Sequence, residues 1–221
     1  MTAESKAGAD VARVRASLRA EVPRFYHASL HLGFSAAVSL GVAFGLVAGI
    51  HELRLAELAC VPAFFVFCTL CEYLGHRYLL HRSSWIGRFT YQKHTLRHHR
   101  FYTDEQFRPE SQRDFAYILF PPAGVLVYML IAVCPFVALF TLAVSRNAGC
   151  LVGATSAVFF LLYELVHLAS HFGDRRSAGG SWRRTMSQHH RIHHRVDLMT
   201  RCNFNIVAPI FDEVFGTRRR E

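Results

Sequence analysis

The sequence predicts an all-helical integral membrane protein with about four transmembrane helices. Hydrophobic residues make up 52% of the 221 positions and charged residues only 19%, which excludes a disordered polypeptide and places the chain at the apolar limit of soluble proteins. Apolar runs of about 20 residues are needed to cross a bilayer core of about 30 Å. Four runs meet this length, at approximately 29–50, 55–75, 115–144 and 148–171.

The segment before the first run has apolar residues at helical spacing from Val11 to Val22. This pattern fits a helix that lies on the membrane surface with its arginines near lipid phosphates, namely Arg13, Arg15 and Arg19. A frayed polar tail is the alternative.

The third run contains prolines and is too long for one straight span. Pro122 suits the first turn of a helix, where a missing N–H costs little, so we expect the helix to begin there. Pro135 should bend it.

The distribution of basic residues predicts the topology. Of the 25 Lys and Arg residues, only Arg54 and Arg146 lie in the short loops that follow the first and third runs, so 23 lie on the other side. The positive-inside rule makes that side cytoplasmic, with both termini there. The net charge of +9 is thereby explained without nucleic acid, and we find no helix-turn-helix or zinc-finger pattern.

Ten or eleven of the fourteen histidines fall in four clusters, each at the cytoplasmic end of a run or just beyond it. The clusters are contained in LGHRYLLH, KHTLRHH, ELVHLASH and SQHHRIHH. Imidazoles three or four residues apart on a helix can bind one metal ion, so we expect His94 and His98 to share a helical face.

Ten imidazoles exceed what one ion accepts, so two metal ions are the sensible stoichiometry. Imidazole suits iron, zinc, copper and nickel alike. Iron would favour dioxygen attack on the C–H bond of a lipid that enters from the bilayer, whereas zinc would favour hydrolysis or transport.

These motifs resemble the fatty acid hydroxylase superfamily, which includes fatty acid hydroxylases and sterol desaturases. The resemblance rests on EYLGHRYLLH, KHTLRHH, ELVHLASH and HRIHH, followed by NFNIVAPIFDEVFGT at the end. The sequence departs from the pattern in three places: the second cluster has one extra residue in its spacing, Phe211 replaces a tryptophan, and His189 has no counterpart.

The resemblance implies a single membrane domain over 29–221, preceded by an amphipathic or polar tail at 1–28, with a cytosolic helical cap that carries a dinuclear iron site. It also implies an O2-dependent reaction on a lipid or other amphiphile. The metal ligands that it implies are His76, His81, His94, His98, His99, His167, His171, His190, His193 and His194.

Three acidic residues are candidates for a catalytic role beside these histidines. Glu72 and Glu164 lie within about one turn before a histidine cluster, and Asp212 lies in the terminal motif. A carboxylate near hydrocarbon is costly unless paired. Metal-bound imidazole usually donates its second N–H to a carboxylate or carbonyl, so we expect these acids to orient the ligands.

The electrons must come from outside the chain, because it contains no haem-binding, GxGxxG or iron–sulfur motif. We expect an electron-transfer protein that is cytochrome b5-like or a ferredoxin. A basic face would suit an acidic carrier, although anionic lipid heads would suit it equally; its residues include Arg97, Arg100, Arg183, Arg184 and Arg195.

Other activities remain open from sequence alone. A desaturase, or an oxidase of sterols, carotenoids or small molecules, would use the same scaffold. A zinc-binding membrane protein without redox chemistry is the alternative from another class, and zinc can also replace iron in a purified sample. Transport is disfavoured because the middles of the runs are nearly free of ionisable residues.

Overall fold

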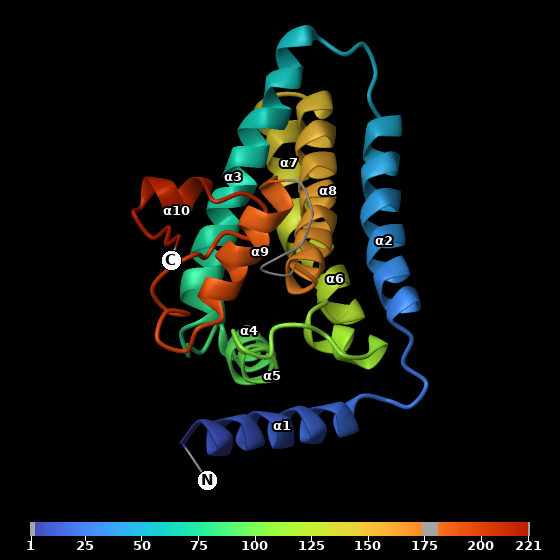
Figure 1. The fold of residues 1–221 in the computed structure, drawn as a ribbon. Helices are drawn as coiled ribbons and strands as arrows, with labels where there is room; N and C mark the ends of the chain where they lie inside the picture. The colour runs from blue at the N-terminus through green and yellow to red at the C-terminus, as the bar shows by residue number, and fades with distance from the viewer. Residues whose placement is uncertain (1–2, 174–180, 221) are drawn as a thin grey trace. The chain divides into compact units, whose positions relative to one another are not determined.

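The computed structural model describes residues 3–173 and 181–220, and within them every regular element is helical (Figure 1). The all-helical prediction is therefore confirmed. The helices are α1 Ala3–Glu21, α2 Ala28–Ala48, α3 Cys60–Gly75, α4 Arg88–Lys93, α5 His99–Phe101, α6 Pro122–Tyr128, α7 Cys134–Ala143, α8 Arg146–His171, α9 Ser181–His193 and α10 Ile210–Val214.

Shorter helical turns join several of these helices without a break. Two are of the 3₁₀ type, at Leu55–Ala59 and Gln112–Tyr117. Three are π-helical turns, at His76–Leu80, His94–His98 and Met129–Val133. π-helical turns are rare and occur frequently at functional sites.

Four helical stretches of the described chain are long and apolar enough to cross a membrane: Ala28–Ala48, Leu55–Leu80, Gln112–Ala143 and Arg146–His171. They match the four predicted runs, and the chain is an integral membrane protein. In the fourth stretch 72% of the apolar 18-residue window is buried within the protein, against 17–22% in the others. The helix α8 is therefore the most enclosed, while the other stretches present apolar side chains outward.

The chain forms two compact units, whose boundaries fall at the start of α2, inside α3, shortly before α6 and inside α8. The span unit comprises residues 29–71 and 119–165. The histidine unit comprises the described parts of 1–28, 72–118 and 166–221. All four histidine clusters belong to the histidine unit.

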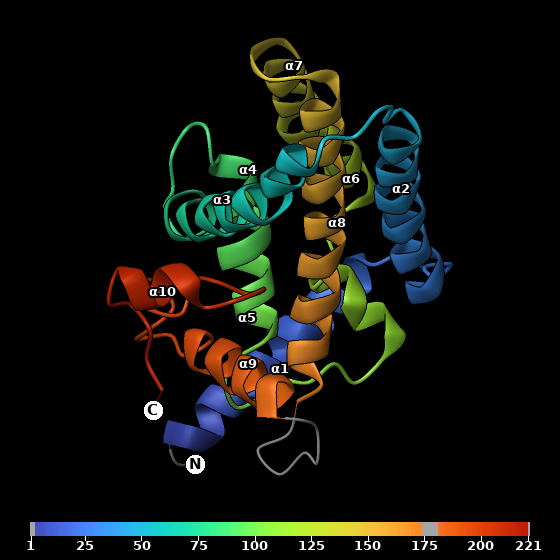
Figure 2. The ribbon, with the colours of Figure 1, turned by 90° about the horizontal axis from the view of Figure 1, so that it is seen from above.

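The core of the span unit joins α2, α6 and α8, which lie next to one another in both views (Figures 1 and 2). Two glycines of α8 let α7 approach closely. A Cβ atom at Gly149 would lie 2.7 Å from the carbonyl oxygen of Val137, and one at Gly153 would lie 2.3 Å from Cγ2 of the same residue. Small residues four apart are a common device for packing membrane helices.

The third span follows the proline pattern. The helix α6 begins at Pro122, as predicted, and the π-helical turn Met129–Val133 ends two residues before Pro135. The irregularity thus falls where a proline removes a backbone donor.

The N-terminal helix α1 differs from expectation in what its arginines contact. Arg15 is only 3% exposed and forms an ion pair with Asp114, and Arg19 pairs with both Asp114 and Glu110. Lipid phosphates were therefore the wrong expectation for Arg15 and Arg19, because the buried Asp114 and the exposed Glu110 of the histidine unit pair with them. Arg13 stays exposed beside Asp10.

Candidate metal centre

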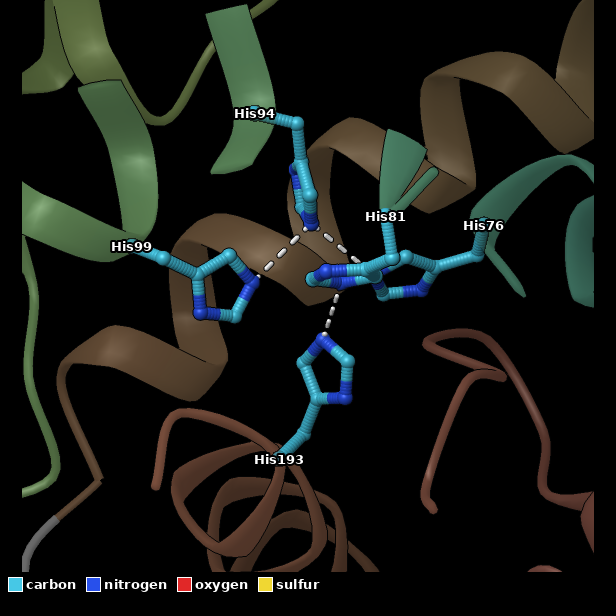
Figure 3. A group of neighbouring side chains, drawn as sticks. All are labelled: His76, His81, His94, His99 and His193. Carbon is cyan, nitrogen blue, oxygen red and sulfur yellow. Dashed lines mark hydrogen bonds between the residues drawn. The ribbon is translucent and has the colours of Figure 1, made fainter. Parts of the chain in front are cut away.

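The ten predicted histidines are all buried and separate into two groups of five. Within each group the candidate ligand nitrogens all lie within 4.8 Å of one another. The first group is His76, His81, His94, His99 and His193, whose rings converge on a common centre (Figure 3). The second group is His98, His167, His171, His190 and His194.

The π-helical turns decide which histidines share a group. In the turn His94–His98 the hydrogen bonds connect residues five apart, so His94 and His99 approach each other, with 3.1 Å between their Nε2 atoms. His98 instead joins the second group. The expectation that His94 and His98 act together, which assumed α-helical spacing, is thus replaced by a division between the groups. The turn at His76–Leu80 similarly separates His76 and His81 by five residues, with their rings stacked at 5.0 Å.

Acceptors on the protein fix the orientation of three imidazoles in the first group. His76 donates from Nδ1 to the carbonyl of Phe204, and His193 donates from Nδ1 to the carbonyl of Cys202 at 2.9 Å. The Nδ1 of His81 lies 3.1 Å from the hydroxyl of Thr95, whose own proton goes to the carbonyl of Leu80. Each Nδ1 therefore carries the ring proton, and each Nε2 keeps its lone pair.

The second group is anchored in the same way, to a different segment. Nδ1 of His98 donates to the carbonyl of Tyr117 at 2.6 Å and Nδ1 of His171 to that of Phe107 at 2.8 Å. Nδ1 of His194 donates to the carbonyl of Tyr102 at 2.5 Å. All three carbonyls belong to the stretch 102–117.

This anchoring tests whether the residues fit a metal ion. The Nε2 atoms of His81 and His193 are 3.0 Å apart, and those of His98 and His194 are 3.1 Å apart. In each pair both Nε2 atoms are acceptors, because both Nδ1 atoms already donate. Two lone pairs facing each other repel, and a cation between them converts the repulsion into coordination. The donor sets therefore fit one metal ion in each group.

Burial keeps these imidazoles neutral. Desolvation lowers the pKa of His98 to about 3 and that of His193 to about 4, and it moves the pKa values of His94, His99, His190 and His194 well below their usual range. Neutral imidazole is the form that binds metal ions. The groups are thus ready for metal at neutral pH.

Asp212 and Glu72 act on the first group through a loop. The Asp212 carboxylate accepts from the backbone N–H groups of Phe204 and Asn205, at 2.9 and 2.8 Å. Glu72 accepts from the N–H of Ile206 at 2.8 Å and from the side-chain amide of Asn205. This loop carries the carbonyl of Phe204, which accepts the hydrogen bond from Nδ1 of His76.

Neither His189 nor Glu164 belongs to a ligand group. Nε2 of His189 lies 3.3 Å from the Asp212 carboxylate. Glu164 belongs to the span unit, where its fully buried carboxylate accepts from the N–H of Phe120 at 3.1 Å and from the hydroxyl of Ser35 at 3.5 Å.

Asp114 is a residue that sequence reasoning missed. It is fully buried and accepts from the backbone N–H groups of Glu110 and Ser111 and from the Arg19 guanidinium. It thereby closes the stretch 102–117 that holds the second group. The available signal was a capping pattern, a serine at 111 followed three residues later by an acid.

Thr95 was also missed, since a threonine beside a histidine has no distinctive spacing. Its hydroxyl, in the π-helical turn His94–His98, accepts the hydrogen bond from Nδ1 of His81. Only the folded backbone brings these two residues together.

Two groups of buried imidazoles, in a chain with apolar helices long enough to span a bilayer, define a histidine-rich membrane protein with donors for two metal ions. A family model described as fatty acid hydroxylase matches residues 61–217, and the chain belongs to this family. The predicted resemblance is confirmed. Membership makes the chain a membrane hydroxylase, hence an oxidoreductase, and implies a lipid substrate. All thirteen predicted site residues lie within the matched range.

A solved structure titled full length scs7p, in which only the hydroxylase domain is visible, shares the fold. The TM-score is 0.61 at 20% sequence identity, over 87% of this chain and 67% of that one. No curated protein matches the chain.

Proposed function

We propose that this protein is an O2-dependent di-iron oxygenase that hydroxylates a C–H bond of a lipid or other amphiphilic substrate. The observation that carries the proposal is the pairing of facing Nε2 lone pairs in both histidine groups. One iron ion would be held by the first group and one by the second. Bound iron supplies the activation of dioxygen that attack on a C–H bond requires.

The chain's own residues prepare both sites before metal arrives. Backbone carbonyls of Phe204 and Cys202 hold two imidazoles of the first group in one tautomer, so no rearrangement is needed on binding. The same holds for the second group on Tyr102, Phe107 and Tyr117. Burial of all ten imidazoles keeps bulk water away from the ligand nitrogens.

The three predicted acids contribute by positioning rather than by contact with the ligands. Asp212 and Glu72 hold the loop on which His76 is anchored. Glu164 holds the N–H of Phe120 within the span unit.

Electrons would come from an external cytochrome b5-like protein or a ferredoxin on the cytoplasmic side. The excess of Lys and Arg outside the two short loops supports that orientation. Exposed arginines of the histidine unit, at 183, 184 and 195, offer complementary charge to an acidic carrier.

The decisive experiment combines metal analysis with lipid analysis. The protein is expressed in iron-supplemented cells, iron and zinc are quantified per chain, and lipid extracts are compared by mass spectrometry with those of the His193→Ala variant. We expect an iron ion in each group and a product that has gained one oxygen atom. A product that has only lost two hydrogens would identify a desaturase, and zinc alone with no new lipid would contradict the oxygenase proposal.

Matched histidine variants separate ligands from bystanders. His98→Ala and His193→Ala should each abolish turnover and lower metal content, because each removes one of five ligands of a group. His27→Ala and His51→Ala should change little, because both lie outside the groups. Equal effects at all four positions would contradict the ligand assignment.

A further inference from the structure

The connection between His81 and His94 exposes an unusual set of large apolar side chains. Trp85 is 89% exposed, Ile86 69% and Phe89 59%. These residues lie within five positions of one another, at the start of α4 and just before it. Exposed apolar residues that gather in one place mark an interaction surface, whereas scattered ones do not.

The same part of the chain is strongly basic. No Asp or Glu occurs between Glu72 and Asp104, while six Lys or Arg residues do. Three of these, Arg82, Arg88 and Lys93, are exposed and belong to the same segment as Trp85, Ile86 and Phe89. Among the described residues, no carboxylate forms an ion pair with any of the three. The surface is therefore complementary to an anionic partner.

Contacts to the backbone carbonyl of Leu79 fix this segment against the end of the second span. The hydroxyl of Thr90 donates to the carbonyl of Leu79 at 3.1 Å. Gly87 approaches the same carbonyl so closely that a Cβ atom there would lie 2.9 Å from it. Since the candidate span ends at Leu80, the segment lies where that span reaches the membrane surface.

We propose that residues Arg82–Lys93 lie in the headgroup region of the bilayer. Trp85, Ile86 and Phe89 enter the boundary between headgroups and acyl chains, and the three basic side chains contact the phosphates of anionic lipids. Tryptophan and basic residues flanking a span are typical of this interface. A lipid bilayer satisfies both features of the surface at once, the apolar side chains and the unpaired positive charge.

The placement has a consequence for the first histidine group. The segment joins His81 to His94, two members of that group. In this placement, lipid lies beside the stretch of chain that links His81 to His94. The proposal does not depend on metal or on oxygenase chemistry, because it concerns only the surface of the segment.

Fluorescence of Trp85 tests the placement directly. The chain has two tryptophans, so Trp182→Phe leaves Trp85 as the sole emitter. The full-length variant is placed in lipid nanodiscs that contain anionic lipid, with or without brominated acyl chains. We expect brominated lipid to quench most of the Trp85 emission and aqueous iodide to quench little of it. Strong quenching by iodide with none by brominated lipid would overturn the proposal. The absence of both would also overturn it, because it would show that Trp85 is enclosed by protein.

The charge is tested separately. The triple variant Arg82→Gln, Arg88→Gln, Lys93→Gln is made in the Trp182→Phe background and compared in neutral and anionic nanodiscs. We expect the parent to show stronger quenching by brominated lipid in anionic discs, and the triple variant to lose that dependence. An undiminished dependence on anionic lipid in the triple variant would refute the phosphate contacts. Far-ultraviolet circular dichroism confirms that each variant keeps its helices.

Discussion

At the scale of single residues, the two nitrogens have different tasks in the six imidazoles whose Nδ1 meets an acceptor on the protein. Nδ1 holds the ring by donating to the protein, and Nε2 faces the centre of a group with its lone pair. This division requires neutral rings, which burial provides by lowering the pKa values. The requirement makes both groups sensitive to acid and to loss of a single acceptor.

Acidification should destabilise the metal-free protein. The pKa of His193 is about 4 in the folded state and about 6.5 in an unfolded chain. The unfolded state therefore takes up the proton first, so the stabilisation is complete above pH 6.5 and is lost as the pH falls toward 4. This residue alone should cost roughly 3 kcal/mol of unfolding free energy at pH 4. Thermal unfolding of the metal-free protein in detergent at several pH values measures it.

His193→Gln provides the control for this pH dependence. The variant cannot titrate at this position, so its unfolding temperature should fall less steeply between pH 6.5 and 4. An identical slope in both proteins would show that His193 does not carry the effect.

Loss of the Thr95 hydroxyl should weaken metal binding by the first group. Thr95→Val removes the acceptor of the His81 Nδ1 proton, so the ring is no longer held in one tautomer. Loss of such a partner typically lowers metal affinity about 10–100-fold, which competition with a chelator measures. Thr95→Ser keeps the hydroxyl and should bind normally; a Ser variant as weak as the Val variant would point to packing instead.

At the scale of elements, each histidine group depends on its own segment of chain, which carboxylates hold in place through hydrogen bonds. Asp212 and Glu72 close the loop 203–207, on which His76 is anchored. Asp114, held by Arg19 of α1, closes the stretch 102–117, on which His98 is anchored. The N-terminal helix therefore supports the second group, and the terminal motif supports the first.

Substitution of the two aspartates should empty different groups. Asp212→Asn should lower the metal content of the first group, and Asp114→Asn that of the second. Each substitution should lower the free energy of unfolding by roughly 2–4 kcal/mol, because a buried amide cannot accept all the hydrogen bonds of a carboxylate. Metal content per chain should fall by about half in each variant, as measured by mass spectrometry of the metals.

Double variants identify the group affected. Asp212→Asn combined with His98→Ala should lose nearly all metal, whereas Asp212→Asn combined with His193→Ala should retain the metal of the second group. Asp114→Asn should give the opposite pairing. The assignment fails if both double variants of either aspartate lose metal equally.

At the scale of the whole molecule, metal ions would join distant parts of the chain. The first group draws on residues from 76 to 193 and the second on residues from 98 to 194. Both lie wholly in the histidine unit. Metal binding should therefore stabilise that unit in particular.

Removal of metal should lower the unfolding temperature and loosen the histidine unit. An ion present at 100 times its dissociation constant stabilises the folded state by about 2.7 kcal/mol. Chelation should increase hydrogen exchange in α9 and in the stretch 102–117 more than in the core of α8. The double variant His98→Ala, His193→Ala should show little further change on chelation, and uniform exchange along the chain would contradict the expectation.

The sequence determined the features that depend on local composition and spacing. Apolar runs of sufficient length predicted four candidate spans, because the bilayer imposes its thickness on any helix that crosses it. The four histidine clusters contain all ten members of the two groups, and the resemblance to the hydroxylase family set His189 apart from them. Pro122 marked the start of α6 through a simple backbone constraint.

Only the tertiary structure decided how these pieces combine. It assigned His98 and His99 to different groups, because a π-helical turn changes which residues share a face. It paired Arg19 with Asp114, 95 positions away, where the sequence suggested lipid phosphate. It brought the carbonyl of Phe204 within hydrogen-bonding distance of Nδ1 of His76, a contact across 128 positions. Contacts at such separation follow from packing of the whole chain, and local spacing carries no information about them.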